Sequence, residues 1–144
     1  MNPPPGDLHL IPGLECYMRY KTLTTITAIL SSINALIYLL IPSFSLSILD
    51  STTNAMGIMN TRVSGACAMG LSVITWLARD FKALKFQRMI AQGNLITLGL
   101  LTIIDIDGIY SGIVNEWGWV IFFADFLLAA GFLIFLFKTT AHDT

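Results

Sequence analysis

The chain has 144 residues, of which 55% are hydrophobic and only 12% are charged. A soluble domain carries roughly 25% charged residues, so these charges are too few to cover a surface that faces water. The formal net charge of −1 excludes the basic field that attracts nucleic acid. We therefore expect a single domain whose outer surface meets the lipid bilayer.

The first 21 residues precede any long apolar run and contain three consecutive prolines. They do not resemble a secretory signal, which carries basic residues early and a small-residue cleavage site after its apolar core. Here Asp7 comes before any lysine or arginine. We expect residues 1–21 to form an irregular segment at the membrane surface, with apolar contacts from side chains such as Leu8 and Tyr17.

Four stretches of the chain are long and apolar enough to cross a membrane as helices. Such a helix needs about 20 mostly apolar residues to match a hydrocarbon core of roughly 30 Å. The connecting segments are too short to shield four such helices from water. Residues 22–138 are therefore predicted to form an all-α integral membrane four-helix bundle with antiparallel neighbours, and residues 139–144 a short cytoplasmic tail. The predicted spans are residues 22–41, 59–78, 89–106 and 117–137.

The basic residues indicate how these spans are oriented. The chain has 8 lysines and arginines, and all except Arg62 lie before the first span, between the second and third, or after the fourth. Short positively charged segments stay in the cytoplasm, so we expect a multi-pass protein with both termini cytoplasmic. The residues on this basic side are Arg19, Lys21, Arg79, Lys82, Lys85, Arg88 and Lys138.

Two ionisable residues lie inside predicted spans, where a charge costs several kcal/mol unless it is paired or neutralised. Asp125 lies about 12 Å into the membrane from the outer side, and Arg62 about one turn into its span from the same side. Helical side chains lean toward the N-terminus of their own helix. Because both spans begin outside, both side chains reach toward the outer surface, and Asp125 is predicted to face the bundle interior.

These positions suggest a ligand-binding cluster in the outer leaflet. The hypothesis joins Arg62 to three carboxylates and one amide at a similar height. In the alternative, Arg62 reaches the headgroups and Asp125 bonds a neighbouring hydroxyl. The residues of the hypothetical cluster are Arg62, Asp105, Asp107, Asp125 and Asn60.

Small residues mark one span as a place of close helix packing. In the second span Ser64 and Ala68 form one small-xxx-small pair, and Ala66 and Gly70 form another. Such pairs let two helix backbones approach closely inside a membrane. The pattern does not distinguish packing within the chain from packing onto a partner. Asn94 in the third span is predicted to join helices by hydrogen bonds.

The sequence gives no support for cofactor or metal chemistry. The histidines, His9 and His142, lie near the two ends, and Cys16 and Cys67 form neither a CxxC motif nor a zinc-ligand spacing. There is no HExxH, GxSxG or Walker A motif. We expect no cofactor, no metal site and no catalytic residue that a motif identifies.

Three classes of function fit these observations. The favoured class is a structural or accessory subunit of a membrane protein assembly, with the bilayer and other membrane protein subunits as partners. The second is a binder or carrier of a lipid-like or small ligand, which would use the cluster around Arg62 and Asp125. The third is a membrane enzyme in which Asp125 acts as acid or base.

Overall fold

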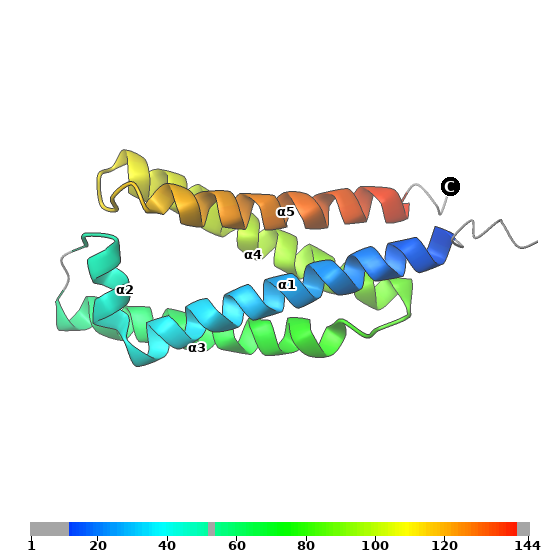
Figure 1. Cartoon of the computed structure of the whole chain (residues 1–144), viewed down its shortest axis with the longest axis horizontal. Coiled ribbons are helices and arrows are strands. Elements are labelled where there is room, and N and C mark those ends of the chain that lie inside the picture. The colour runs from blue at the N-terminus through cyan, green and yellow to red at the C-terminus, as the bar shows by residue number, and fades with distance from the viewer. Residues whose placement is uncertain (1–11, 52–53, 141–144) are drawn as a thin grey trace, which may run out of the picture.

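The computed structural model describes residues 12–51 and 54–140, which form five α-helices and no strand. Four helices are long and one is short. α1 packs mainly on α3, and α4 packs mainly on α5, so the long helices form two antiparallel pairs (Figure 1). The helices are α1 (Pro12–Leu40), α2 (Pro42–Ile48), α3 (Ala55–Ala78), α4 (Leu84–Tyr110) and α5 (Gly118–Thr140).

Three of these helices are long and apolar enough to cross a membrane. They cover Tyr17–Leu40, Leu84–Tyr110 and Gly118–Thr139. The all-helical prediction is thus confirmed. α3 has 24 residues but does not belong to this group, because polar residues such as Asn60 and Arg62 lower its hydrophobicity.

The start of α1 corrects the prediction for the N-terminal segment. Residues 12–21 are helical rather than irregular, and residues 1–11 lie outside the described part of the chain. Pro12 occupies the first position of the helix, where proline loses no hydrogen bond. Tyr20 is buried, and its hydroxyl donates a hydrogen bond of 3.1 Å to the carbonyl oxygen of Ala78 at the end of α3. Tertiary contacts therefore hold this helical turn in place.

The segments at the α2 end connect the two helix pairs. The side chain of Asn115 donates to the carbonyl oxygen of Ile48 at 2.8 Å, and the hydroxyl of Ser51 donates to the carbonyl oxygen of Ile113 at 2.9 Å. The sequence did not predict α2, because Pro42 was interpreted only as the end of the first span. Proline also favours the first turn of a helix, and α2 begins at that residue.

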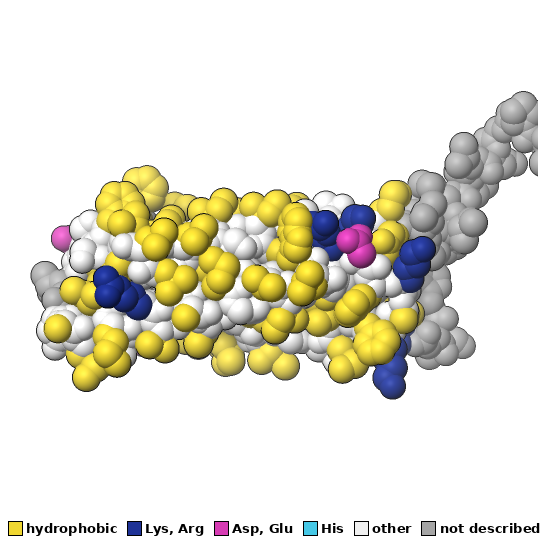
Figure 2. Space-filling model, turned by 90° about the horizontal axis from the view of Figure 1, so that it is seen from below, with side chains coloured by type: hydrophobic (Ala, Val, Ile, Leu, Met, Phe, Trp, Pro, Cys, Tyr) yellow, Lys and Arg dark blue, Asp and Glu magenta, His cyan; other side chains and the backbone are white. Residues whose placement is uncertain are grey.

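The opposite end, where α1 begins and α5 ends, carries most of the cations (Figure 2). Lys21 forms an ion pair of 2.7 Å with Asp80. Hydrogen bonds from Lys21 and Arg79 lower the pKa of Asp80 below its ordinary value. The pair therefore persists at neutral pH and is lost as the pH falls through that lowered pKa. Both side chains are exposed, so the pair contributes little to stability.

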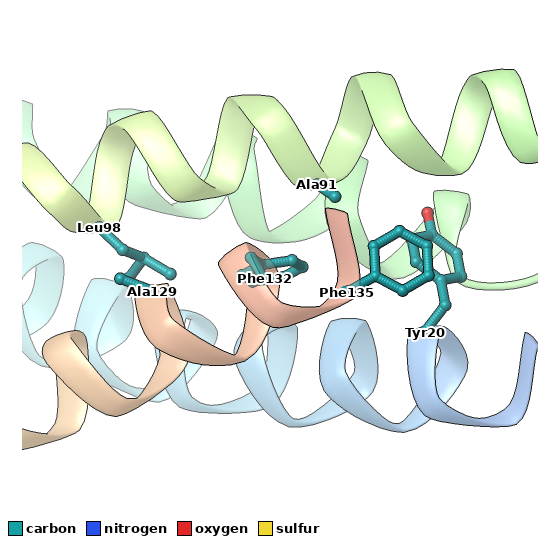
Figure 3. Close-up of a cluster of buried hydrophobic side chains, with 6 residues drawn as sticks. All are labelled: Tyr20, Ala91, Leu98, Ala129, Phe132 and Phe135. Carbon is teal, nitrogen blue, oxygen red and sulfur yellow. The ribbon is translucent and has the colours of Figure 1, made fainter. Parts of the chain in front are cut away.

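The hydrophobic core lies toward this same end. A cluster of buried side chains joins α1, α4 and α5, and the rings of Tyr20 and Phe135 lie 5.4 Å apart (Figure 3). Much of the remaining apolar surface faces outward, as the hydrophobic side chains across Figure 2 show. The members of the core are Tyr20, Ala91, Leu98, Ala129, Phe132 and Phe135.

α1 and α3 approach each other most closely at Gly65. A Cβ atom at this position would lie 2.9 Å from the Cβ of Tyr38 and 3.0 Å from the carbonyl oxygen of Ala35. Ala35 is fully buried in this contact. Close packing of α3 is therefore confirmed. The residue that permits it, Gly65, belongs to neither of the two small-residue pairs predicted from the sequence.

Replacing Gly65 with alanine should destabilise the chain, because the added methyl group meets backbone and Cβ atoms that cannot move away. We expect the free energy of unfolding in detergent to fall by about 1–2 kcal/mol, the usual cost of overpacking less the helix propensity that alanine adds. Gly99→Ala is the matched control, since a Cβ there meets no atom within 4 Å. An equal effect of both substitutions would contradict the close contact.

Candidate polar site between the helices

Two sets of polar side chains lie between the helices. In the half of the molecule nearer the cationic end, Thr75 and Asn94 exchange hydrogen bonds of 3.3 and 3.2 Å between α3 and α4. Ser32 donates to Ser72 at 2.9 Å between α1 and α3. The predicted joining role of Asn94 is confirmed. These groups form hydrogen bonds with one another between the helices, which fits a joining role.

The second set lies nearer the α2 end and is named here the carboxylate cluster, consisting of Asn34, Tyr38, Asp105 and Asp125. Tyr38, Asp105 and Asp125 are half-buried, and Asn34 is exposed beside them. The carboxyl groups of Asp105 and Asp125 interact electrostatically with each other and with Tyr38, which forms a side-chain hydrogen bond with Asn34. Asp105 lies five residues before the end of α4 and Asp125 seven residues after the start of α5. Both are therefore about 8–10 Å from the helix ends.

No cation compensates the charge of this cluster within the described chain, where the ion pairs involve only Lys21, Arg79 and Asp80. The Oδ2 atom of Asp105 is buried and has no hydrogen-bond partner. A buried acceptor without a partner costs about 1–3 kcal/mol. Ionisable groups within apolar helices that carry such a cost are candidates for function.

The structure keeps two members of the predicted cluster together and separates the others. Asp105 and Asp125 interact, and Asp125 lies half-buried, within electrostatic range of Tyr38 on α1 and of Asp105 on α4. Arg62, Asn60 and Asp107 are exposed and contribute nothing to the carboxylate cluster.

Arg62 is exposed and forms no ion pair with another described residue. It comes three residues before Gly65, which faces α1, so at about 100° per residue its side chain lies at the flank of α3, about 60° from the side that faces α1. The alternative, in which Arg62 extends toward the headgroups, agrees with this exposed position. The pairing of Arg62 with Asp105 or Asp125 does not.

Sequence reasoning missed Tyr38 and Asn34 as members of the site. They lie four residues apart in the first predicted span and so share one face of α1. Asn34 lies six residues, or about 9 Å, before the end of α1, which matches the height of Asp105 and Asp125, and Tyr38 lies about 3 Å from that end and leans back toward Asn34. This match in spacing and height was a signal that could have identified them.

The all-helical architecture, with three helices of spanning length and apolarity around polar side chains, suggests a helical membrane protein. A family model described as Domain of unknown function (DUF8292) matches residues 11–138, and the chain belongs to this family. The match reaches from the start of α1 into the last turn of α5. No curated protein and no solved structure matches the chain.

Replacing Asp105 with asparagine should stabilise the chain, because the substitution removes one of two interacting carboxyl groups and supplies an amide donor. We expect the free energy of unfolding in detergent at neutral pH to rise by about 1 kcal/mol. Asp107→Asn, at an exposed position on the same helix, should change it by less than about 0.5 kcal/mol. A loss of stability in the Asp105 variant would show that this carboxyl group has a favourable partner.

Proposed function

We propose that the chain is a four-span integral membrane protein with both termini cytoplasmic, and that it serves as a structural or accessory subunit of a membrane protein assembly. Its apolar exterior and three helices of spanning length and apolarity support insertion into a bilayer. α3, which has 24 residues and runs antiparallel to α1, would supply the fourth span. The clustering of cations at the end where α1 begins and α5 ends supports the orientation (Figure 2).

The observation that carries the accessory role is the outward face of α3. Gly70 is exposed, and a Cβ there would meet no atom within 4 Å. Ala66, one turn away on the same face, is also exposed. Small residues at this spacing let a neighbouring helix approach closely in a membrane. Gly65 already supplies the close contact within the chain, so the outward pair is available to a partner.

Apolar residues extend this outward face along α3. They recur at alternating intervals of three and four residues, which is the spacing of a helix-packing seam. All of them are exposed. The outward α3 face, as the term is used below, consists of Met59, Val63, Ala66, Gly70, Val73 and Leu77.

Replacing Gly70 with leucine should abolish association with a partner helix, because the larger side chain holds the two backbones apart. In mild detergent the wild-type chain should migrate on native gels as a stoichiometric complex. The Gly70→Leu variant should migrate as the chain alone, and Gly99→Leu should behave as the wild type. If wild-type protein is monomeric in mild detergent and gives no cross-linked product in its own membrane, the accessory role is wrong.

The orientation is tested by cysteine labelling. In a background without Cys16 and Cys67, we expect a membrane-impermeant maleimide added to intact cells to modify Ser111→Cys. Lys82→Cys should be modified only after the membrane is permeabilised, since its segment is basic and remains in the cytoplasm. The reverse pattern would place both termini outside.

A second candidate function rests on the unpartnered Oδ2 atom of Asp105. The carboxylate cluster would bind a small ligand or lipid-like molecule through a cationic or hydrogen-bond-donating group, because the cluster offers acceptors and negative charge. The cation that would have suited an anionic ligand, Arg62, lies elsewhere. An enzyme with Asp125 as acid or base would use the same cluster, and Asp125→Asn would then abolish activity while leaving assembly intact.

A further inference from the structure

We propose that the outward α3 face is covered by α4 of a second copy of this chain. The inference rests on the proposed accessory function and names the partner of the same surface. It is carried by a matching face on α4 and by one pair of opposite charges toward the α2 end of the two faces.

The outward face of α4 has the same construction as that of α3. Exposed residues recur along it at alternating intervals of four and three. A Cβ added to Gly93 would meet no atom within 4 Å, so this glycine, like Gly70, contributes nothing to packing within the chain. The outward α4 face consists of Met89, Gly93, Ile96, Leu100, Ile103 and Asp107.

The two faces match in height when copies share one orientation in the membrane. α3 runs away from the α2 end and α4 runs toward it, so α3 of one copy and α4 of another are antiparallel. Thr75 of α3 and Asn94 of α4 exchange hydrogen bonds within the chain and so lie at one height. At about 1.5 Å per residue, Gly70 lies about 8 Å from this level toward the α2 end, and Gly93 lies about 2 Å from it toward the cationic end. The two faces therefore overlap along most of their length, although the two glycines do not meet.

Charge also matches at the α2 end of the two faces. Arg62 flanks the outward α3 face one turn from Ala66, and Asp107 belongs to the outward α4 face. Their helix positions are about 10 and 5 Å from the α2 end. Arg62 leans toward that end and Asp107 leans away from it, so their side chains converge. Both are exposed, and neither forms an ion pair with another described residue.

Other pairings of these surfaces are disfavoured. If α3 packed on α3 of a second copy about a two-fold axis, Arg62 would oppose Arg62, and a contact between two α4 helices would oppose Asp107 to Asp107. Like charges placed together at an interface cost several kcal/mol. Only the contact between α3 and α4 pairs opposite charges.

The two outward faces lie on opposite flanks of the molecule. Thr75 and Asn94 mark the sides on which α3 and α4 face each other within the chain. At about 100° per residue, the outward α3 face is turned by about 120–180° from Thr75, and the outward α4 face by about 100–180° from Asn94. Each copy therefore presents one face to each of two neighbours, and the contact repeats from copy to copy instead of closing as a reciprocal dimer.

Charge reversal tests the inference. Differently tagged wild-type copies reconstituted into phosphatidylcholine vesicles should associate, measured by energy transfer between labels on the tags. Arg62→Asp and Asp107→Arg, each alone, should weaken association by about tenfold or more. Mixing the two single variants should restore wild-type association, because opposite charges again face each other at each contact between one variant and the other. Gly99→Leu should associate like the wild type, and unfolding in detergent checks that each variant is folded.

Each other outcome has a definite meaning. Failure of wild-type copies to associate overturns the inference, and so does association that both charge reversals leave unchanged. If copies do not associate but Gly70→Leu removes the chain from a native complex with another protein, the accessory function stands and the identity of the partner is wrong. If no association of any kind occurs, both proposals fail.

Discussion

The close contact of α1 with α3 at Gly65 determines how the rest of the molecule is arranged. Because Gly65 must face α1, the positions on the opposite side of α3, including Gly70, face outward. The same contact sets the rotation of α1, which directs Tyr38 toward Asp105 and Asp125. The contact at Gly65 thus fixes which side chains form the polar site between the helices and which form the outward face of α3.

The fold was largely predictable from the sequence, because apolar runs of about 20 residues leave few alternatives to helices. Sequence rules for helix boundaries were less informative where contacts between distant parts of the chain decide where a helix begins. The start of α1 at Pro12 depends on the burial of Tyr20 against Ala78 and Phe135, which lie far away in the sequence. Sequence spacing alone could not show these contacts.

The candidate site was predicted in part for a similar reason. Asp105 and Asp125 could be placed at one height by counting along their helices, and they do interact. The direction of Arg62 depends on which small residue of α3 contacts α1. The contact with α1 could be made by any of three small residues, Ser64, Gly65 or Ala66. Moving the contact by one residue would turn the side chain of Arg62 by about 100° about the axis of α3. The sequence alone therefore could not show whether Arg62 pairs with a carboxylate.

The uneven placement of the hydrophobic core has a consequence for motion. Buried rings and aliphatic side chains hold α1, α4 and α5 together near the cationic end (Figure 3). Toward the other end, the carboxyl groups of Asp105 and Asp125 lie between the same helices. Local opening starts where few apolar contacts resist it. The helices should therefore separate transiently at the α2 end while they stay packed at the cationic end. A small polar molecule would then enter beside Asp105 without disruption of the hydrophobic core.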